Sequence, residues 1–408
     1  MSEWIKAEEY CVSVFDGTHD TPKVTETGYK LVTSKNILSN TLDLNSAYYI
    51  SEEDFANINK RSKVKQYDIL FSMIGTVGSL YFETSDTIDY AIKNIGVFSC
   101  GNKEKAEWLY YYLQSSYAQQ YIKRYLNGAV QKFLPLKGLR EFPVPQFNKE
   151  LHNRIKILLN IDQKIQINNQ INRELEDMAK TLYDYWFVQF DFPDQNGKPY
   201  KSSGGKMVYN PELKREIPEG WGVDSLWNIA NFYNGLAMQK YRPVTTEDDY
   251  LPVIKIREMM NGFTKDTEKA RLDIPTEAVV ERGDILFSWS ATLEVIIWGK
   301  EKGALNQHIF KVTSDTYPKS FIYFELKSYL KVFKAIAELR KTTMGHITQD
   351  HLKQAKIVVP PIELISKIDA QLQHIMSEKQ ILENQNQELT QLRDWLLPML
   401  MNGQVKVE

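Results

Sequence analysis

The chain has 408 residues, of which 43% are hydrophobic and 25% charged, and its formal net charge is −2. This length is typical of two domains with connecting structure, and the composition excludes a disordered or fibrous protein. The near-neutral charge argues against a stand-alone nonspecific DNA binder, so any DNA partner must meet basic surface that is locally clustered or supplied by other subunits.

The amino-terminal segment lacks the basic and apolar regions of a signal peptide, and no stretch approaches about 18 consecutive apolar residues. We therefore expect a cytoplasmic protein without a membrane partner. Cys11 and Cys100 are the only cysteines and have no CxxC spacing, so neither a disulfide framework nor a zinc site is predicted. The six histidines are scattered, and we expect no metal site.

Along the chain, short β-branched or aromatic runs predict strands, and two tyrosine-rich stretches predict helices. The expected strands of the first half are Tyr29–Thr33 and Ile69–Met73, followed by a helix over Lys105–Tyr125. The second half repeats this order, with expected strands Val253–Ile256 and Ile285–Trp289 and a helix over Ser320–Arg340. Both halves are thus predicted to mix helix and strand.

The chain contains an internal repeat with a period of about 215 residues, far longer than a solenoid unit. The segment Asp68–Gly75 recurs as Asp284–Ala291, and the next matched segments align Asn94 with Asn306 and Phe98 with Phe310. Further on, the segment beginning at Gly128 matches the one beginning at Gly345, and each ends in a pair of prolines. This pattern indicates a duplicated domain.

After each proline pair comes a helical pattern of about 35 to 40 residues, with apolar positions spaced alternately by three and four. Such spacing is typical of a coiled-coil seam. Asn168 interrupts the first stripe, and Lys379 and Asn386 interrupt the second, as polar residues that set the register of a coiled coil do. We expect the two helices to pair, the alternative being that each packs only on its own domain.

Sequence motifs for the common enzyme chemistries are missing. Neither half carries GxxxxGK[ST], HExxH or a plausible GxSxG motif, which argues against an ATPase, a zinc protease and an α/β-hydrolase. The single Pro-Pro pair, Pro360–Pro361, lies in Val-Val-Pro-Pro-Ile at a domain edge and not in the Pro-Pro-Tyr/Phe context expected of a DNA methyltransferase. We therefore predict no catalytic site in this chain.

Several local strings join the duplication and the long helices, namely Phe15–Pro22, Trp186–Pro193, Gly204–Lys206 and Ile217–Trp221. In their order and spacing they make the chain resemble the specificity subunits of type I restriction-modification systems over essentially its whole length. The resemblance implies an α+β fold, with two duplicated mixed α/β target-recognition domains separated by two long antiparallel coiled-coil helices in a pseudo-two-fold arrangement. The implied boundaries are 1–148 and 217–362 for the domains, 149–190 and 363–408 for the helices, and 191–216 for an irregular linker.

In that family each target-recognition domain reads one half of a split double-stranded DNA sequence. The helices hold the domains apart and bind two modification (methyltransferase) subunits, and two restriction (motor-nuclease) subunits complete the complex. The resemblance implies that this chain is not itself an enzyme and binds no cofactor. S-adenosylmethionine, ATP and magnesium are expected in the partner subunits.

The family contacts bases from loops with polar side chains. Amide side chains suit adenine, whereas Arg and Lys suit guanine or phosphate. We project this role onto matching loops of the first domain, at Thr18, His19, Thr21, Lys35, Asn36, Ser72, Lys93, Asn94, Gln131 and Lys132. The corresponding candidates in the second domain are Asn234, Gln239, Lys240, Lys255, Arg257, Ser288, Ser290, Asn306, Gln307, His308, His346, Thr348 and Gln349.

Three other interpretations stay open. The chain could be the specificity subunit of a related, type IIB-like restriction system, in which cutting and methylation share one partner chain. It could be a coiled-coil adaptor without sequence specificity, or an enzyme with an unrecognised active site. The DNA target cannot be predicted, because no simple code relates such loops to bases.

Overall fold

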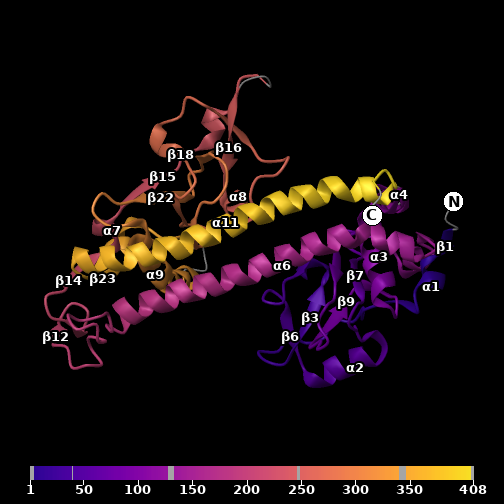
Figure 1. Cartoon of the computed structure of the whole chain (residues 1–408), viewed down its shortest axis with the longest axis horizontal. Helices are drawn as coiled ribbons and strands as arrows, with labels where there is room; N and C mark the ends of the chain where they lie inside the picture. The colour runs from indigo at the N-terminus through magenta and orange to yellow at the C-terminus, as the bar shows by residue number, and fades with distance from the viewer. Residues whose placement is uncertain (1–3, 39, 127–132, 246–248, 340–345, 406–408) are drawn as a thin grey trace. The chain divides into compact units, whose positions relative to one another are not determined.

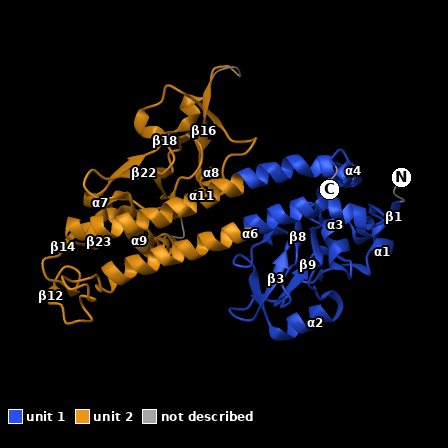
Figure 2. Ribbon diagram, in the orientation of Figure 1, with its two compact units in different colours: residues 1–165, 388–408 blue, residues 166–387 orange. Residues whose placement is uncertain are grey.

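The computed structural model describes residues 4–38, 40–126, 133–245, 249–339 and 346–405. These residues form two compact units, one of residues 1–165 and 388–408 and one of residues 166–387 (Figures 1 and 2). The long helices α6 (Lys149–Tyr183) and α11 (Ile362–Met401) each contribute one part to either unit. We call residues 4–145 the first copy and residues 222–359 the second copy.

The first copy is built around a four-stranded antiparallel sheet of order β2-β10-β7-β8. A second sheet, β6-β3-β9, contains the parallel pair β3 and β9. The elements are β1 (Trp4–Lys6), α1 (Ala7–Tyr10), β2 (Ser13–Asp16), β3 (Tyr29–Thr33), η1 (Ser34–Asn36), β4 (Ile37–Leu38), β5 (Thr41–Leu42), β6 (Tyr48–Ile50), α2 (Glu52–Ser62), β7 (Ile69–Ser72), β8 (Leu80–Phe82), β9 (Tyr90–Lys93), β10 (Ile95–Ser99), α3 (Lys103–Gln114), α4 (Ser116–Leu126), α5 (Leu136–Arg140) and β11 (Pro143–Pro145).

The second copy repeats the order of the four-stranded sheet and the parallel pair of the other sheet, but that other sheet has four strands where the first copy has three. Its four-stranded sheet has the order β15-β22-β19-β20, and its other sheet, β17-β16-β21-β18, contains the parallel pair β16 and β21. The elements are β14 (Gly222–Ser225), α7 (Leu226–Ile229), β15 (Asn231–Asn234), η3 (Met238–Tyr241), β16 (Tyr250–Ile254), α8 (Ile256–Asn261), β17 (Lys269–Arg271), η4 (Thr276–Ala278), β18 (Val279–Val280), β19 (Ile285–Ser288), β20 (Glu294–Ile297), β21 (Gly303–Leu305), β22 (Ile309–Thr313), α9 (Lys319–Leu339), α10 (Gln349–Gln354) and β23 (Lys356–Val359).

The duplication and the mixed α/β content are therefore confirmed. The motif Ile-Leu-Phe-Ser forms the strands β7 and β19, and all four residues are buried in both, as expected of strands with a partner on each edge. The predicted helix over 105–125 is wrong in one respect, because it is broken at Ser115. That residue is extended, and its hydroxyl accepts a hydrogen bond from the Ala118 amide, capping α4.

The sequence alignment of the two copies is also wrong in one place. Ser72 and Ser288 are equivalent, and the ladders place Ile95 opposite Ser72 and Ile309 opposite Ser288. Phe310 is therefore equivalent to Gly96 and not to Phe98. An alignment shifted by two residues keeps the same face of the strand, so the hydrophobic pattern could not reveal the error.

Parts of the apolar stripes of both long helices pack into the cores of the units, whereas Met178 of α6 and Leu392 of α11 are exposed. In the first unit, Ile155 and Leu158 of α6 and Leu400 of α11 join the core of the first copy. In the second unit, Tyr183 of α6 and Ile368 of α11 join the core of the second copy. Each of these core side chains is at most 1% exposed, so each long helix is held by tertiary packing.

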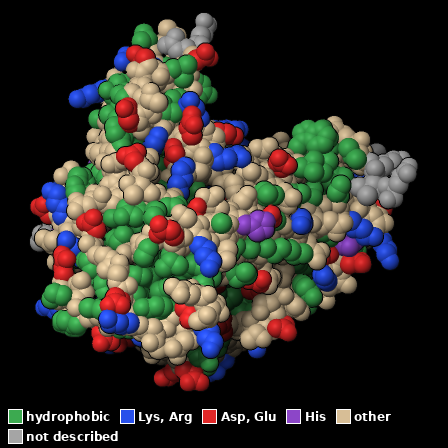
Figure 3. Space-filling view, turned by 60° about the vertical axis from the view of Figure 1, so that its left-hand side comes forward, with side chains coloured by type: hydrophobic (Ala, Val, Ile, Leu, Met, Phe, Trp, Pro, Cys, Tyr) green, Lys and Arg blue, Asp and Glu red, His purple; other side chains and the backbone are tan. Residues whose placement is uncertain are grey.

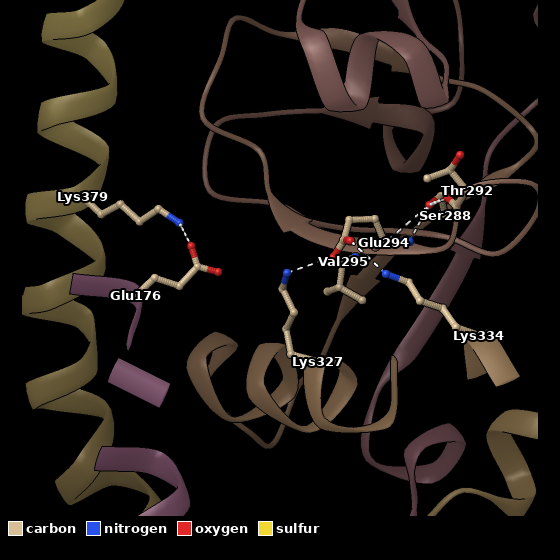
Figure 4. A network of polar contacts seen from close by, with 8 residues as sticks. All are labelled: Glu176, Ser288, Thr292, Glu294, Val295, Lys327, Lys334 and Lys379. Atoms are coloured by element: carbon tan, nitrogen blue, oxygen red, sulfur yellow. Dashed lines mark hydrogen bonds and ion pairs between the residues drawn. The ribbon is translucent and has the colours of Figure 1, made fainter. Parts of the chain in front are cut away.

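The long helices also pair with each other inside each unit. In the second unit, the Asn168 amide donates to Asn386 Oδ1 at 2.9 Å. Figure 4 shows a second contact of this unit, in which Lys379 Nζ lies 2.7 Å from Glu176 Oε2. In the first unit, Arg393 Nη1 contacts Asp162 Oδ1 at 3.0 Å. Later residues of α6 thus meet earlier residues of α11, so the pairing is antiparallel. The predicted polar seam is confirmed, and packing on the domains alone is excluded.

The segment between α6 and the second copy is more ordered than an irregular linker. After η2 (Asp184–Val188), the Phe192 ring stacks on Tyr200 and Trp221 with centroid distances of 4.6 and 4.9 Å. Strand β12 (Met207–Asn210) then pairs with β13 (Arg215–Pro218) as a hairpin. The turns that the Gly- and Ser-rich composition predicts are present over 194–206. The stacked aromatic rings hold the chain on either side of these turns in place.

Two carboxylates of the second unit lie in contrasting surroundings. Glu294 contacts Lys327 at 2.9 Å and Lys334 at 3.4 Å (Figure 4). Burial alone would raise the pKa of Glu294, but the hydrogen bond and charge of Lys327 hold this pKa below its usual value. Glu325 of α9 accepts a 2.6 Å hydrogen bond from the Tyr183 hydroxyl, and desolvation raises its pKa from 4.5 to about 7.

We expect Glu325→Gln to make the second unit more stable at pH 8 and to flatten its dependence on pH. Between pH 4.5 and 7 the unfolded chain releases the Glu325 proton while the folded chain keeps it, so stability falls as the pH rises through this window. This shift in the pKa of Glu325 corresponds to a loss on the order of 3 kcal/mol in the free energy of unfolding. Glutamine keeps an oxygen for the Tyr183 hydroxyl and carries no charge.

The measurement is the thermal midpoint of both proteins between pH 5 and 8. Glu338→Gln, on an exposed position of the same helix, is the matched control. If the thermal midpoint of Glu325→Gln falls with pH as steeply as that of the wild-type protein, another group is responsible for the pH dependence.

Candidate nucleic-acid interface

In the first copy, the end of the edge strand β2 contacts the loop between β9 and β10. In the second copy, the end of the edge strand β15 contacts the loop between β21 and β22. In the first copy the Thr18 amide donates to Ile92 O at 3.0 Å, and the Asn94 amide donates to Thr18 O at 3.1 Å. A Cβ atom at Gly17 would lie 2.4 Å from Ile92 O. The second copy repeats this approach, since a Cβ atom at Gly235 would lie 2.2 Å from Asn306 O. Only glycine allows such contact, so the same corner is built twice.

The corner of the first copy gathers five of the predicted residues, Thr18, His19, Thr21, Lys93 and Asn94, which we call the first loop cluster. His19 Nδ1 lies 2.7 Å from Asn94 Oδ1, and the Lys93 ammonium donates to the Thr21 hydroxyl. Asn94 has a φ of 53°, a left-handed conformation that asparagine tolerates better than most residues. The cluster combines a cation, an amide, hydroxyls and an imidazole.

Asp16 lies behind this cluster and contacts both His19 and Arg61. Asp16 Oδ2 is 3.2 Å from His19 Nε2, and Asp16 Oδ1 is 3.7 Å from Arg61 Nη2.

The turns that follow β3 in the first copy and β16 in the second copy each carry an exposed cation. In the first copy Asn36 caps this turn, accepting from the Thr33 amide at 2.8 Å, and in the second copy Glu258 accepts from the Lys255 amide at 3.3 Å. Asn36 is 4% exposed, and its side-chain amide forms its hydrogen bonds with other residues of the domain. Lys35 and Arg257 occupy equivalent positions on the surface.

The corner of the second copy is centred on an aromatic side chain that the sequence analysis missed. The Trp289 indole N–H donates to Asn234 Oδ1 at 2.9 Å. The ring centroids of His308 and His346 lie 5.5 and 6.3 Å from that of Trp289. We call Asn234, Trp289, His308 and His346 the tryptophan cluster. Its signal in the sequence was an aromatic residue in the loop position where the first copy has Met73.

The candidate serines serve the fold. The Ser72 hydroxyl donates to Ile74 O at 3.0 Å, and the Ser288 hydroxyl donates to Thr292 O at 2.5 Å. Both side chains are fully buried, and Ser290 is 7% exposed. They shape the loops that follow β7 and β19.

The other candidates lie around these corners. Lys255 contacts Glu268 at 2.5 Å, and Arg257 contacts Glu258 at 2.6 Å, so both cations have acidic partners. Asn306 is 5% exposed and Gln307 Nε2 lies 3.3 Å from His308 Nε2. The remaining positions are Gln239 and Lys240, exposed in η3, Thr348 and Gln349 at the start of α10, and Gln131 and Lys132, which lie outside the described residues.

The visible surface carries charges of both signs. On the face shown in Figure 3, Lys and Arg side chains are interspersed with Asp and Glu side chains, as expected for a net charge of −2. Among the helices of the described ranges, none has the length and apolar composition needed to span a bilayer. Over the same ranges, no group of three His, Cys, Asp or Glu side chains is placed to hold a metal ion.

Known proteins are similar to this chain in sequence and in fold. The specificity subunit of the type I restriction enzyme MjaIX from Methanocaldococcus jannaschii is 27% identical over 318 residues, covering 74% of this chain and 70% of that protein. The HindI specificity subunit from Haemophilus influenzae is 23% identical over 407 residues, covering 85% and 88%. The crystal structure of the type I restriction-modification S subunit from M. genitalium matches with a TM-score of 0.50 at 14% identity, covering 98% and 96%.

The family described as Type I restriction modification DNA specificity domain matches residues 20–177 and again residues 218–391. The two matches cover most of the chain and fall on the two copies of the fold, each with part of its following long helix. The chain therefore belongs to the type I restriction-modification DNA specificity family.

Proposed function

We propose that this chain reads DNA sequence for a type I restriction-modification complex, each copy reading one part of a split site. The observation that carries the proposal is the same corner built twice with different side chains. The first copy presents His19 and Asn94 there, whereas the second presents Asn234, Trp289 and His308. A duplicated scaffold whose contact residues have diverged suits two half-sites of different sequence.

The chemistry of the corners suits duplex DNA. Amide and imidazole groups can donate to and accept from base edges in the major groove, and lysine can bind guanine or phosphate. Lys35 is exposed close to the first loop cluster, since the adjacent Ser34 hydroxyl donates to Asn94 O at 3.3 Å. The cations around the corner would position the DNA backbone while the amides read bases.

We further propose that the paired helices set the distance between the readers and bind two modification subunits, with two restriction subunits completing the complex. The relatives MjaIX and HindI carry the name of specificity subunits of type I restriction enzymes, which supports this assignment. In this proposal the chain is not catalytic and works in the cytoplasm. S-adenosylmethionine, ATP and magnesium would be bound by the partner subunits.

The test is reconstitution. The purified chain alone is expected to transfer no methyl groups and to cut no DNA, because no motif for either reaction is present in its sequence. Addition of the chain to its modification subunits is expected to switch on methylation of particular sequences, measured by transfer of labelled methyl groups to duplex DNA. Methylation by the chain alone would contradict the proposal, as would methylation by the complex without sequence preference. If a single partner chain both methylates and cuts, the system is instead of the related type.

A further inference from the structure

The Trp289–Asn234 hydrogen bond fixes how the Asn234 amide is turned. An indole N–H can only donate, so the atom 2.9 Å away must be the amide oxygen, whichever way the amide is drawn. The two N–H donors of the same amide then point away from the ring. Asn234 itself is an exposed residue at the end of β15.

Trp289 is held in place from several sides. Its carbonyl accepts from the Ile347 amide at 2.8 Å, and its amide donates to His308 O at 3.3 Å. The indole also packs at 5.9 Å from the Phe310 ring, and Phe310 lies opposite Asn234 in the ladder between β15 and β22. The donor direction is therefore set by the fold before DNA arrives, which is how supporting residues make a contact specific.

The geometry points to Trp289 as a positioning residue for base recognition, one that turns the Asn234 amide so that only its N–H donors face the base. This inference rests on the proposed function. In the major groove, guanine, thymine and adenine each offer at least one acceptor, whereas cytosine offers only an amino donor. At the base that Asn234 contacts, the second copy therefore rejects cytosine.

The first copy carries no such pair at the equivalent positions. The ladders place Asp16 where the second copy has Asn234, and the repeat places Met73 where it has Trp289. Met73 is 1% exposed within the core of the first copy. The effect of Trp289 is thus confined to one half-site, and Met73→Leu provides a matched control outside the proposed contacts.

The experiment uses the full chain assembled with its modification subunits and a duplex library randomised over the recognition sequence. Trp289→Phe keeps a packed ring and removes the N–H donor, so the freed amide can present its oxygen to cytosine. We expect discrimination against cytosine to fall roughly tenfold at one position, at the low end of the usual cost of a mismatched pair. All other positions, and the whole specificity of Met73→Leu, are expected to stay unchanged.

Asn234→Asp is the second variant and does not depend on the folding of Trp289→Phe. Its carboxylate can still accept from the indole but has no donor, so the same position should change to a preference for cytosine, whose amino group a carboxylate accepts. An unchanged preference in Asn234→Asp, or continued rejection of cytosine by a folded, active Trp289→Phe complex, would overturn the inference. A wild-type complex without any sequence preference would instead overturn the proposed function.

Discussion

Exchange of residues 1–147 for the corresponding domain of a relative is expected to replace one half of the recognised sequence and leave the other half intact. The structure supports such an exchange, because the first and last strands of each copy pair with each other. Trp4 lies opposite Pro145 between β1 and β11, and Gly222 lies opposite Val359 between β14 and β23. Each copy is therefore closed at the point where it joins the long helices.

The effect should be large. Each mismatched base pair costs about 1–3 kcal/mol, so loss of several base contacts lowers modification of the original site by roughly two orders of magnitude or more. The imported domain must pack on Ile155 and Leu158 of α6, so the donor should have apolar residues on the same stripe. The recognised sequence of the exchanged complex is read by sequencing of methylated DNA.

The reciprocal exchange of residues 222–359 is the control and should alter the other half of the site. If either exchange changes both halves, the copies do not read independently.

The second large effect is expected from lengthening the helix pair. Insertion of four residues next to Asn168 in α6 and four next to Asn386 in α11 adds about 6 Å to each helix, close to two base-pair steps of about 3.4 Å. The two sites are chosen because Asn168 and Asn386 contact each other across the seam, so both helices lengthen at one level. Four residues slightly exceed a turn, and the seam accommodates them as a local discontinuity.

We expect both half-sites to be retained while the unread gap between them grows by one or two base pairs. Insertion in α6 alone should instead place the Glu176–Lys379 contact out of register by four residues and lower the thermal midpoint. The doubly lengthened chain with an unchanged gap would show that the helices do not set the distance between the readers.

The coiled-coil seam could be predicted from the sequence because it depends on spacing alone. Alternating steps of three and four residues identify the buried side of a helix, so Asn168, Lys379 and Asn386 stand out as polar exceptions. The strands β7 and β19 could also be predicted from the sequence, because four apolar or small residues, all buried in the structure, follow a charged turn in each copy.

The side chains at the corners were harder to assign, because polar residues in loops serve two purposes that look alike in a sequence. Asn36 and Ser288 were predicted to face DNA, but their polar groups bond to neighbouring backbone inside the domain. Trp289 was missed because it was assigned to the end of the expected strand Ile285–Trp289, where a tryptophan suggests core packing, whereas β19 ends at Ser288. The hydrogen bond of Trp289 to Asn234 depends on a contact 55 residues apart, which no local pattern contains.

The most direct test of the two-reader account is the sequence methylated by the complete complex, determined by methylation-sensitive long-read sequencing of exposed DNA. The account predicts a single split motif, with two specific parts of different sequence separated by an unread gap of constant length. One continuous motif, a gap that varies between sites, or methylation without sequence preference would contradict it.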